Sequence, residues 1–275
     1  GDPFEMSGAL SGTIIQRNTL RRSSGKNADA FDLNSGNGVT YRNNLVHDVS
    51  DKGFSVGTAG GAPSTGIILS NNIVWNATTG IAVKDGSLAT IVNNTIANCS
   101  YGIQAYPKYS QEGGHVVTGY NNILWNNGAT IVITNGSIQM EFSDLAGGDN
   151  IGVNQTNYIT SNNISTDPLF IDAAGFDFQL SSNSPAIGTG RDGGSMGVAY
   201  PVGGLPDAPA ALCALSVGSQ IQLEWTDTSD NENSVVIERS TNKIEWTQIA
   251  LLGANSTYAT DGNAVANQNY YYRAK

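Results

Sequence analysis

The chain has 275 residues and a formal net charge of −10, with 13% charged residues, 39% hydrophobic residues and 33 glycines. This composition indicates a soluble, turn-rich protein with enough residues for a large core or two domains. An acidic chain without basic clusters repels phosphate, so nucleic acid is not an expected partner, whereas carboxylate clusters can collect calcium. No apolar run approaches membrane-spanning length, and the first residues lack the pattern of a signal peptide.

A short asparagine-containing motif recurs along the first half of the chain, as RNTL, NNLV, NNIV, NNTI and NNIL. β-prone runs lie before and after each motif asparagine, and a third run follows. Three strands per repeat predict the coils of a parallel β-solenoid, in which each coil pairs with its neighbours. We expect the motif asparagines to adopt left-handed backbone angles and to hydrogen-bond from coil to coil. They are residues 18, 44, 72, 94 and 122.

Alignment of the third runs, which begin near residues 29, 52, 79 and 101, predicts two outward columns of side chains across four coils. Small residues in the middle predict a shallow trough with room for a sugar ring, since coils lie about 4.8 Å apart. One column contains Asp32, Ser55, Ala82 and Gln104, and the other contains Asn34, Gly57, Lys84 and Tyr106.

Further charged residues lie at the ends of these runs, namely Asp29, Asp51, Lys52, Asp85 and Lys108. Such clustering in a sparsely charged chain is typical of a site whose groups perturb one another's pKa. The alternative is a set of exposed ion pairs, each worth roughly 0–1 kcal/mol.

The asparagine ladder and the three-strand repeat resemble the right-handed parallel β-helices of the pectate lyase-like superfamily over about residues 12–190. The segment STDPLFIDAAGFDFQLSSNSPAIGTG (165–190) is similar to the ending of many secreted bacterial β-helix proteins. Nothing before residue 12 has the pattern of an N-terminal cap, so we expect an incomplete first coil. The expected fold class is all-β, with a right-handed single-stranded parallel β-helix over residues 1–199, secreted or at the cell surface.

A Pro/Gly-rich linker is predicted at residues 200–208. Residues 209–275 contain alternating strands separated by turn clusters, with Trp225 and Trp246 as expected core aromatics, and resemble a fibronectin type III β-sandwich. The segment NYYYRAK is similar to the tyrosine-bearing strand that one more strand follows in that family. We therefore expect a sandwich without its last strand, in a chain that belongs to a longer secreted protein with other domains.

The segment NADAFDL (27–33) resembles the calcium-binding segment of family 9 polysaccharide lyases. This resemblance implies metal-ligand roles for Asp29 and Asp32, and Asp51 and Asp85 are the expected further calcium ligands. The family's first paired aspartate is Ala28 here, and its catalytic lysine would fall at Ser55. A lysine base must therefore be Lys84 or Lys52. The expected substrate-binding residues are Asn34, Ser55, Gln104, Tyr106 and Lys108.

Two hypotheses follow for the function. The first is a calcium-assisted lyase that removes the C5 proton of a uronate in an acidic polysaccharide, with epimerase or hydrolase activity less favoured. The second is a non-catalytic surface, matrix or adhesion protein that uses the β-helix as a rigid scaffold. The mixed charge of the trough favours the enzyme, whereas the displaced lysine and the appended module favour the scaffold.

Overall fold

The computed structural model describes residues 1–25, 27–146, 151–152, 157–198, 209–228 and 234–275. The chain divides into two compact units, Gly1–Gly204 and Leu205–Lys275. The predicted linker, residues 200–208, lies outside the described residues. Within the described part of the chain, no helix is long and apolar enough to cross a membrane.

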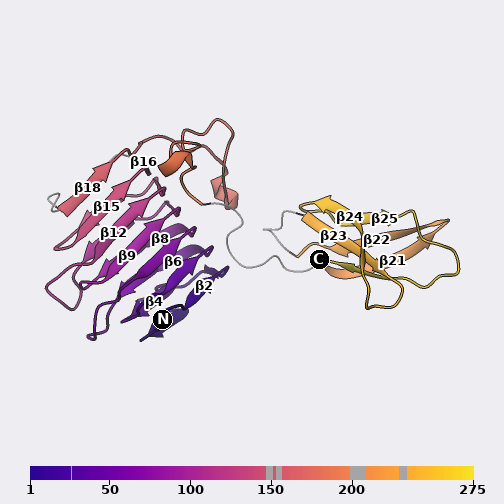
Figure 1. Ribbon diagram of the computed structural model, residues 1–275, viewed down its shortest axis with the longest axis horizontal. Coiled ribbons are helices and arrows are strands. Elements are labelled where there is room, and N and C mark those ends of the chain that lie inside the picture. The colour runs from indigo at the N-terminus through magenta and orange to yellow at the C-terminus, as the bar shows by residue number, and fades with distance from the viewer. Residues whose placement is uncertain (26, 147–150, 153–156, 199–208, 229–233) are drawn as a thin grey trace. The chain divides into compact units, whose positions relative to one another are not determined.

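The first unit is a parallel β-solenoid made of two long sheets (Figure 1). The larger sheet contains β1 (Phe4–Ser7), β3 (Thr19–Arg21), β4 (Phe31–Asn34), β6 (Leu45–Gly57), β8 (Ile73–Lys84), β10 (Thr95–Ala97), β11 (Tyr101–Tyr106), β13 (Ile123–Trp125), β14 (Ala129–Ile133), β16 (Asp144–Ala146) and β17 (Ile151–Gly152). The second sheet contains β2 (Ile14–Gln16), β5 (Thr40–Arg42), β7 (Ile67–Ser70), β9 (Leu88–Val92), β12 (His115–Tyr120), β15 (Ser137–Glu141) and β18 (Tyr158–Ser161).

Two of the three strands predicted for each coil belong to the larger sheet. β6 and β8 each run through a corner, so that each contains both the run after the motif asparagine and the third run. In the following coils the same path is divided into β10 and β11, and then into β13 and β14. The run before each motif asparagine forms the second sheet, so the predicted three-run repeat is confirmed.

The motif asparagines form a continuous ladder along the corner between the two sheets. The side-chain amide of each of the first four donates to the Oδ1 atom of the asparagine one coil later, at 2.9–3.1 Å. The same oxygen accepts the backbone N–H of the preceding ladder asparagine, at 2.9–3.1 Å. Buried amides of this kind must be satisfied within the protein, and here the asparagine of each coil accepts the donors of the coil before it. The ladder contains Asn18, Asn44, Asn72, Asn94 and Asn122.

The left-handed backbone angle at this corner belongs to the residue before the ladder asparagine. We expected the ladder residue itself to adopt it, and this detail is wrong. A second left-handed corner follows four residues after each ladder position, and asparagine occupies it in the last three coils. The first corner has φ of 54–55° at Asn43, Asn71, Asn93 and Asn121, and the second has φ of 53–58° at Asn76, Asn98 and Asn126. Asparagine tolerates this region better than most residues, which explains why it occupies most of these corner positions.

The solenoid core is built from inward side chains that stack in columns. Phe31 lies face to face with Phe54 one coil away, with ring centroids 4.9 Å apart, and Tyr41 meets both rings edge-on. Ile81 and Ile103 extend this column in register. Each buried side chain of this size contributes about 1.5–3 kcal/mol to folding. The core therefore fixes which residues of the third runs face outward.

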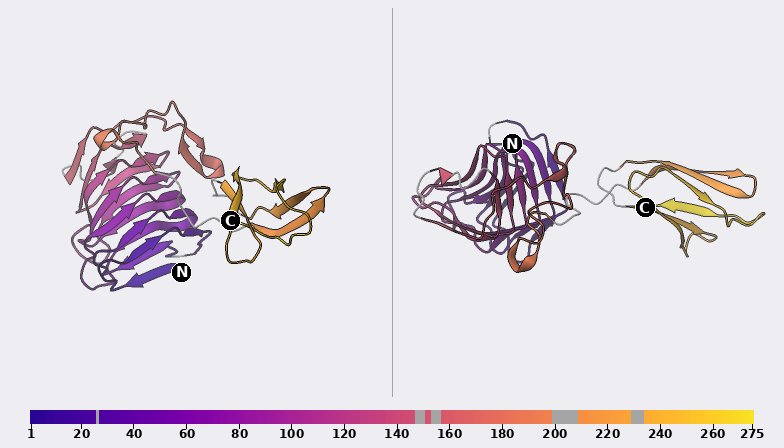
Figure 2. Two further views of the ribbon diagram at one scale, coloured as in Figure 1. Left: turned by 45° about the vertical axis from the view of Figure 1, so that its right-hand side comes forward. Right: turned by 90° about the horizontal axis from the view of Figure 1, so that it is seen from above.

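Residues 165–198, which we call the flank segment, fold back against the outer side of the larger sheet (Figure 2). The segment contains a short antiparallel hairpin, β19 (Phe170–Asp172) and β20 (Asp177–Leu180), with two 3-10 turns at Ala173–Gly175 and Arg191–Gly193. Its Phe178 ring lies 5.4 Å from Trp75, and its Phe170 ring lies 5.9 Å from Trp125. The segment covers an apolar side of the solenoid that would otherwise face water.

The solenoid begins earlier than the sequence indicated. β1 pairs in parallel with β4, from Phe4 opposite Phe31 to Ser7 opposite Asn34. The family resemblance was expected from about residue 12, so β1 extends the repeat before that start and within the predicted β-helix of residues 1–199. The signal was weak because the β1 segment, FEMS, carries no motif asparagine of its own.

The second unit consists of two small antiparallel sheets that share one core. Trp225 is buried in this core, as predicted. Trp246 was also expected there, but it lies outside the core under the guanidinium of Arg273, 4.3 Å from the ring centre. One sheet orders β21 (Ala210–Val217), β22 (Gln220–Thr226) and β25 (Tyr258–Asp261), and the other orders β24 (Thr247–Gly253), β23 (Ser234–Ser240) and β26 (Tyr271–Ala274).

Replacement of Asn72 by alanine should lower the free energy of unfolding by about 2–4 kcal/mol, because two buried donors of Asn44 lose their acceptor. Urea unfolding followed by circular dichroism measures this change. Asn18→Ala is the matched control, since Asn18 is half-buried at the first rung and should cost about 1 kcal/mol or less. Equal losses in the two variants would contradict a stabilising role for the buried ladder.

Candidate functional site

The candidate site is the outward strip of the larger sheet on β4, β6, β8 and β11. The observed register pairs Asp32 with Ser55, Ser55 with Ala82, and Ala82 with Gln104. In the second column, Asn34 lies opposite Gly57 and Lys84 opposite Tyr106. Both predicted columns are therefore present in the predicted order.

The strip does not contain the open trough that the small residues suggested. The side chain of Lys84 lies against Gly57, where a Cβ atom would come within 2.7 Å of Lys84 Cε. The Lys84 ammonium reaches the neighbouring coil and donates to Ser55 Oγ at 2.7 Å. Lys84 and Ser55 are each only 1% exposed. The expected trough is filled by the lysine, because Gly57 leaves the space that this side chain occupies.

Lys84 is held by a hydroxyl group rather than by a direct carboxylate partner. Ser55 Oγ accepts from Lys84 and donates to Asp32 Oδ1 at 2.6 Å, whereas Lys84 Nζ lies 3.9 Å from that oxygen. Burial lowers the pKa of Lys84, the charge of Asp32 opposes this effect, and the positive charges of Lys108 and Lys52 reinforce it. The site therefore favours the neutral amine more than water does, and a neutral amine can accept a proton.

Lys52 has the opposite environment. Its ammonium lies 3.0 Å from Asp29 Oδ1 and 2.8 Å from Asp51 Oδ1. Burial disfavours its charge, but the hydrogen bond to Asp51 and the charge of Asp29 outweigh burial and raise the pKa of Lys52. This environment favours the ammonium form of Lys52, whereas the environment of Lys84 favours the neutral amine.

Asp85 anchors a loop. Its Oδ1 atom accepts the backbone N–H groups of Lys108, Tyr109 and Ser110, at 2.6, 2.7 and 3.1 Å. Burial opposes ionisation, but these three donors hold the pKa of Asp85 below its usual range. Asp85 has a φ of 56° and is only 1% exposed, so the Lys84-Asp85 corner is buried rather than solvated.

The remaining predicted substrate contacts lie around the rim of the strip. Asn34 Nδ2 donates to Asp32 Oδ2 at 3.2 Å, and Thr79 Oγ1 donates to Gln104 Oε1 at 2.7 Å. Burial raises the pKa of Tyr106 to about 12. Lys108 is exposed. Gln104, Tyr106 and Lys108 therefore keep surface that a ligand can reach.

The four aspartates predicted to bind calcium do not converge on one point. Asp29 and Asp51 bind Lys52, Asp85 binds the loop, and Asp32 accepts from Ser55 and Asn34. In the part of the chain that the structure describes, no group of three or more His, Cys, Asp or Glu side chains could hold a metal ion. The donor set therefore does not fit a resident calcium ion.

Sequence reasoning missed two features of the strip. It treated Gly57 as part of a binding surface, although Gly57 provides the space for Lys84. It also missed the hydrogen bonds from the loop backbone to Asp85, because backbone donors cannot be recognised from residue types. The glycine beside a lysine in the aligned columns was the one signal that could have predicted the first feature.

The chain is similar to a known protein family. A family model described as "right handed beta helix region" matches residues 1–145, which are just over half of the chain and include every residue of the strip. A search of curated proteins found no matching relative.

Replacement of each lysine by methionine should separate their roles. Lys52→Met leaves Asp29 buried beside a neutral side chain and should lower the free energy of unfolding by about 3–5 kcal/mol. Lys84→Met removes a buried ammonium whose carboxylate partner, Asp32, lies 3.9 Å away at the limit of an ion pair, and should raise the free energy of unfolding by about 1 kcal/mol at pH 7. Urea unfolding of both variants measures the difference, and a large loss for Lys84→Met would contradict our assignment.

The stability of the unaltered protein should also depend on pH through Lys84. Because the pKa is lowered on folding, the unfolded chain binds more protons between the folded-state pKa and 10.5, so this group adds stability as pH rises through that window. Lys84→Met should lack this contribution. Denaturant unfolding at a series of alkaline pH values gives the slope of the unfolding free energy against pH for the unaltered protein and for Lys84→Met. Identical slopes would show that Lys84 does not cause the pH dependence.

Proposed function

Because the chain belongs to the right-handed β-helix family, we propose that it acts on an acidic, uronate-containing polysaccharide at its outer strip, as a lyase with Lys84 as general base. The observation that carries this proposal is the environment of Lys84, a buried amine held by a serine hydroxyl 2.7 Å away. A lysine of lowered pKa on the outer face of a sheet is typical of a site kept for proton transfer.

The contrast with Lys52 supports this choice. Where the strip buries a lysine for stability, it places two carboxylates within 3.0 Å of the ammonium. Lys84 lacks such a pair, so its burial costs stability that packing around the strip must offset. Functional sites commonly retain such destabilising groups because the chemistry needs them.

The chemistry is a β-elimination with two proton transfers. The neutral Lys84 amine would take the C5 proton of a uronate, the freed electron pair would form the C4–C5 double bond, and the C4–O bond would break. The departing oxygen then takes a proton from the lysine or from water. Ser55 and Asp32 would hold the amine in position.

Rim residues would bind the substrate in this scheme. Lys108 is exposed beside the strip and would balance the charge of the uronate carboxylate. Gln104 and Tyr106 would contact sugar hydroxyl groups. Since the aspartates do not fit a resident calcium ion, no step is assigned to calcium. The lyase assay below tests whether activity requires calcium. Lys84 is enclosed, so the sugar must displace rim side chains to reach it.

We also propose the finer family assignments. The asparagine ladder supports membership of the pectate lyase-like superfamily, and two antiparallel sheets around a buried tryptophan support a fibronectin type III-like second unit. We propose that the protein is secreted or lies at the cell surface, and that other domains accompany these two units in a longer chain.

A second candidate function is a non-catalytic extracellular scaffold. The observation that favours it is the closure of the strip, where Lys84 is 1% and Lys52 is 7% exposed. In this case the polar contacts would join neighbouring coils and stiffen the solenoid as a spacer for the second unit.

The lyase assay follows the ultraviolet absorbance of unsaturated uronate with pectate, alginate and glycosaminoglycans, in calcium and then in chelator. We expect a rise on one substrate that Lys84→Met reduces by about 10²-fold or more, since general-base catalysis contributes typically 10²–10⁴-fold. Lys108→Ala is the matched control and should mainly raise KM. The wild-type kcat/KM should increase with pH through a pKa below the 10.5 of free lysine.

A flat trace on every substrate, from protein whose circular dichroism shows a folded β structure, would contradict the lyase and favour the scaffold. Activity that survives in Lys84→Met would support a polysaccharide lyase but exclude Lys84 as its general base.

A further inference from the structure

The chain contains two histidines, and one of them joins a serine to a glutamate. His115 Nδ1 lies 2.8 Å from Ser137 Oγ, and His115 Nε2 lies 3.1 Å from Glu112 Oε1. His115 is the first residue of β12 and pairs in register with Ser137, the first residue of β15 one coil later. The three side chains therefore form a hydrogen-bonded row at one end of the second sheet.

The two partners of His115 determine which ring nitrogen carries the hydrogen. An ionised carboxylate can only accept, so the Nε2 atom beside Glu112 must be the protonated one. In the neutral ring the lone pair of Nδ1 then faces Ser137, and the serine hydroxyl donates its proton to this nitrogen. A carboxylate, an imidazole and a hydroxyl in this order activate a serine for nucleophilic attack.

The loop that carries Glu112 is held at several points. Asp85 accepts three of its backbone N–H groups, and Ser110 Oγ donates to the carbonyl oxygen of Glu112 at 2.6 Å. Gly86 lies beside the carboxylate, where a Cβ atom would come within 3.2 Å of Glu112 Oε2. The side chain of Glu112 is 68% exposed and that of His115 is 23% exposed. The row is thus held in place and still open to a substrate.

The next coil places an amide on the other side of Ser137. Tyr158 pairs with Ile138, so Asn157 follows Ser137 in the same column. Asn157 Nδ2 donates to the carbonyl oxygen of Gly136 at 3.0 Å, which uses one of its two N–H groups. The other N–H can donate to an oxygen that becomes negative during attack by Ser137. Ser137 therefore has a base on one side and a hydrogen-bond donor on the other.

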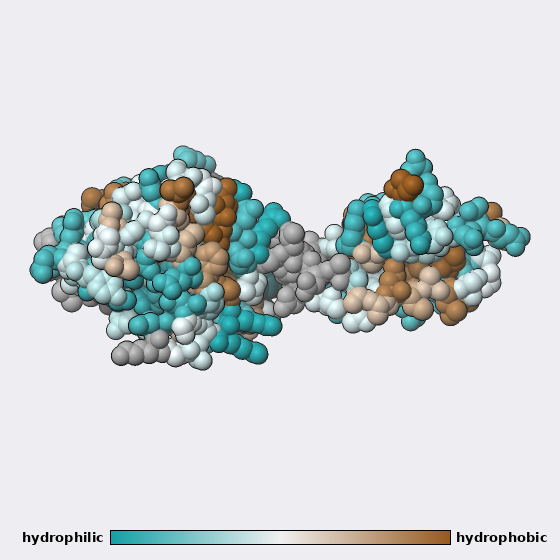
Figure 3. Space-filling model, turned by 90° about the horizontal axis from the view of Figure 1, so that it is seen from below, coloured by the Kyte–Doolittle hydropathy of each residue, from teal (hydrophilic) through white to brown (hydrophobic). Residues whose placement is uncertain are grey.

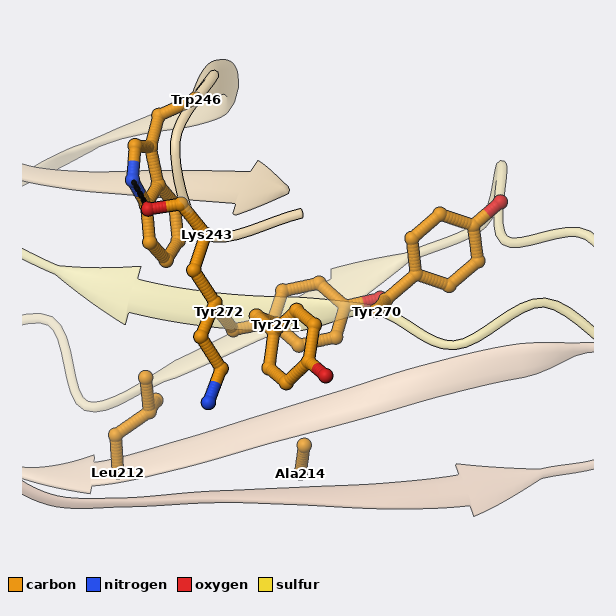
Figure 4. Close-up of a pocket in the computed structure, with 7 residues that line it drawn as sticks. All are labelled: Leu212, Ala214, Lys243, Trp246, Tyr270, Tyr271 and Tyr272. Carbon is orange, nitrogen blue, oxygen red and sulfur yellow. Dashed lines mark hydrogen bonds between the residues drawn. The ribbon is translucent and has the colours of Figure 1, made fainter. Parts of the chain in front are cut away.

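The other histidine and the pocket of the second unit have different surroundings. His47 Nδ1 bonds to Asp48 Oδ2 at 2.9 Å, and its ring lies against Phe176. The second unit has hydrophobic patches on its surface (Figure 3). The side chains that line its pocket are aliphatic or aromatic apart from Lys243 (Figure 4). Neither place, as far as the described residues go, sets a serine beside an imidazole.

We propose that Ser137, His115 and Glu112 hydrolyse carboxylic esters, with Ser137 as nucleophile, His115 as base, Glu112 as positioning residue and Asn157 as oxyanion donor. Ser137 Oγ attacks the ester carbonyl carbon and passes its proton to His115 Nδ1. The bond from that carbon to the alcohol oxygen breaks, and the departing oxygen takes this proton. A water molecule then gives a proton to His115 and attacks the acyl group, and Ser137 leaves and regains the proton.

The test follows the release of p-nitrophenol from p-nitrophenyl acetate by the full chain. We expect hydrolysis above the buffer rate, which Ser137→Ala and His115→Gln should each lower by about 10²-fold or more. Ser70→Ala is the matched control, because Ser70 is a half-buried serine at the end of β7 and should not affect the rate. A fluorophosphonate should label the unaltered protein once, at Ser137, as measured by peptide mass spectrometry. Circular dichroism verifies that each variant is folded.

Nuclear magnetic resonance tests the positioning role of Glu112. The nitrogen chemical shifts of the His115 ring should place its hydrogen on Nε2 in the unaltered protein. Glu112→Gln should weaken this preference and lower kcat by about tenfold or more, with little change in KM.

Two comparisons separate this activity from the proposed lyase. Lyase activity should persist in Ser137→Ala, and ester hydrolysis should persist in Lys84→Met. The proposal would be overturned by a folded protein that does not hydrolyse the ester, by undiminished hydrolysis in Ser137→Ala, or by fluorophosphonate on another residue.

Discussion

The solenoid depends on one constraint, which is that the buried asparagines at the corner between the sheets must find hydrogen-bond partners in neighbouring coils. The ladder of asparagines meets this requirement at the corner between the sheets, where each Oδ1 atom accepts both a side-chain amide and a backbone N–H. A shift of one coil by a single residue would leave both donors without an acceptor. The ladder thus holds the sheets in register, and the inward column from Phe31 to Ile103 fills the core only in that register.

The same register decides the chemistry of the outer strip. Side chains on neighbouring coils are held about 4.8 Å apart, so the environment of a charged residue is set by whatever lies one coil away. Lys52 meets the carboxylate of Asp29 and remains charged. Lys84 lies against Gly57 and donates to Ser55, and burial there lowers its pKa. Two lysines on the same outer strip therefore have different chemistry.

The repeat, the strand pairing and the outward columns could be predicted because they depend on spacing alone. The asparagine motif gave the coil length, and alternation gave the face of Asp32 and Lys84. The path of flexible side chains could not be predicted in this way. Whether Lys84 points to solvent or lies across Gly57 depends on contacts between coils, and the three donors to Asp85 are backbone groups of a distant loop. Trp246 was misplaced for a similar reason, since its partner Arg273 comes from another strand.

The flank segment changes how the solenoid can come apart. A stack in which each coil contacts only its neighbours behaves as a one-dimensional array, and its end coils can fray one at a time. Here one continuous segment packs Phe178 against the coil of Ile73 and Met196 against the coil of Ile123. A coil within that span cannot open without also releasing the segment from its neighbours. The array is thereby converted into a single cooperative unit over these coils, while the coils before Leu45 retain the freedom to open independently.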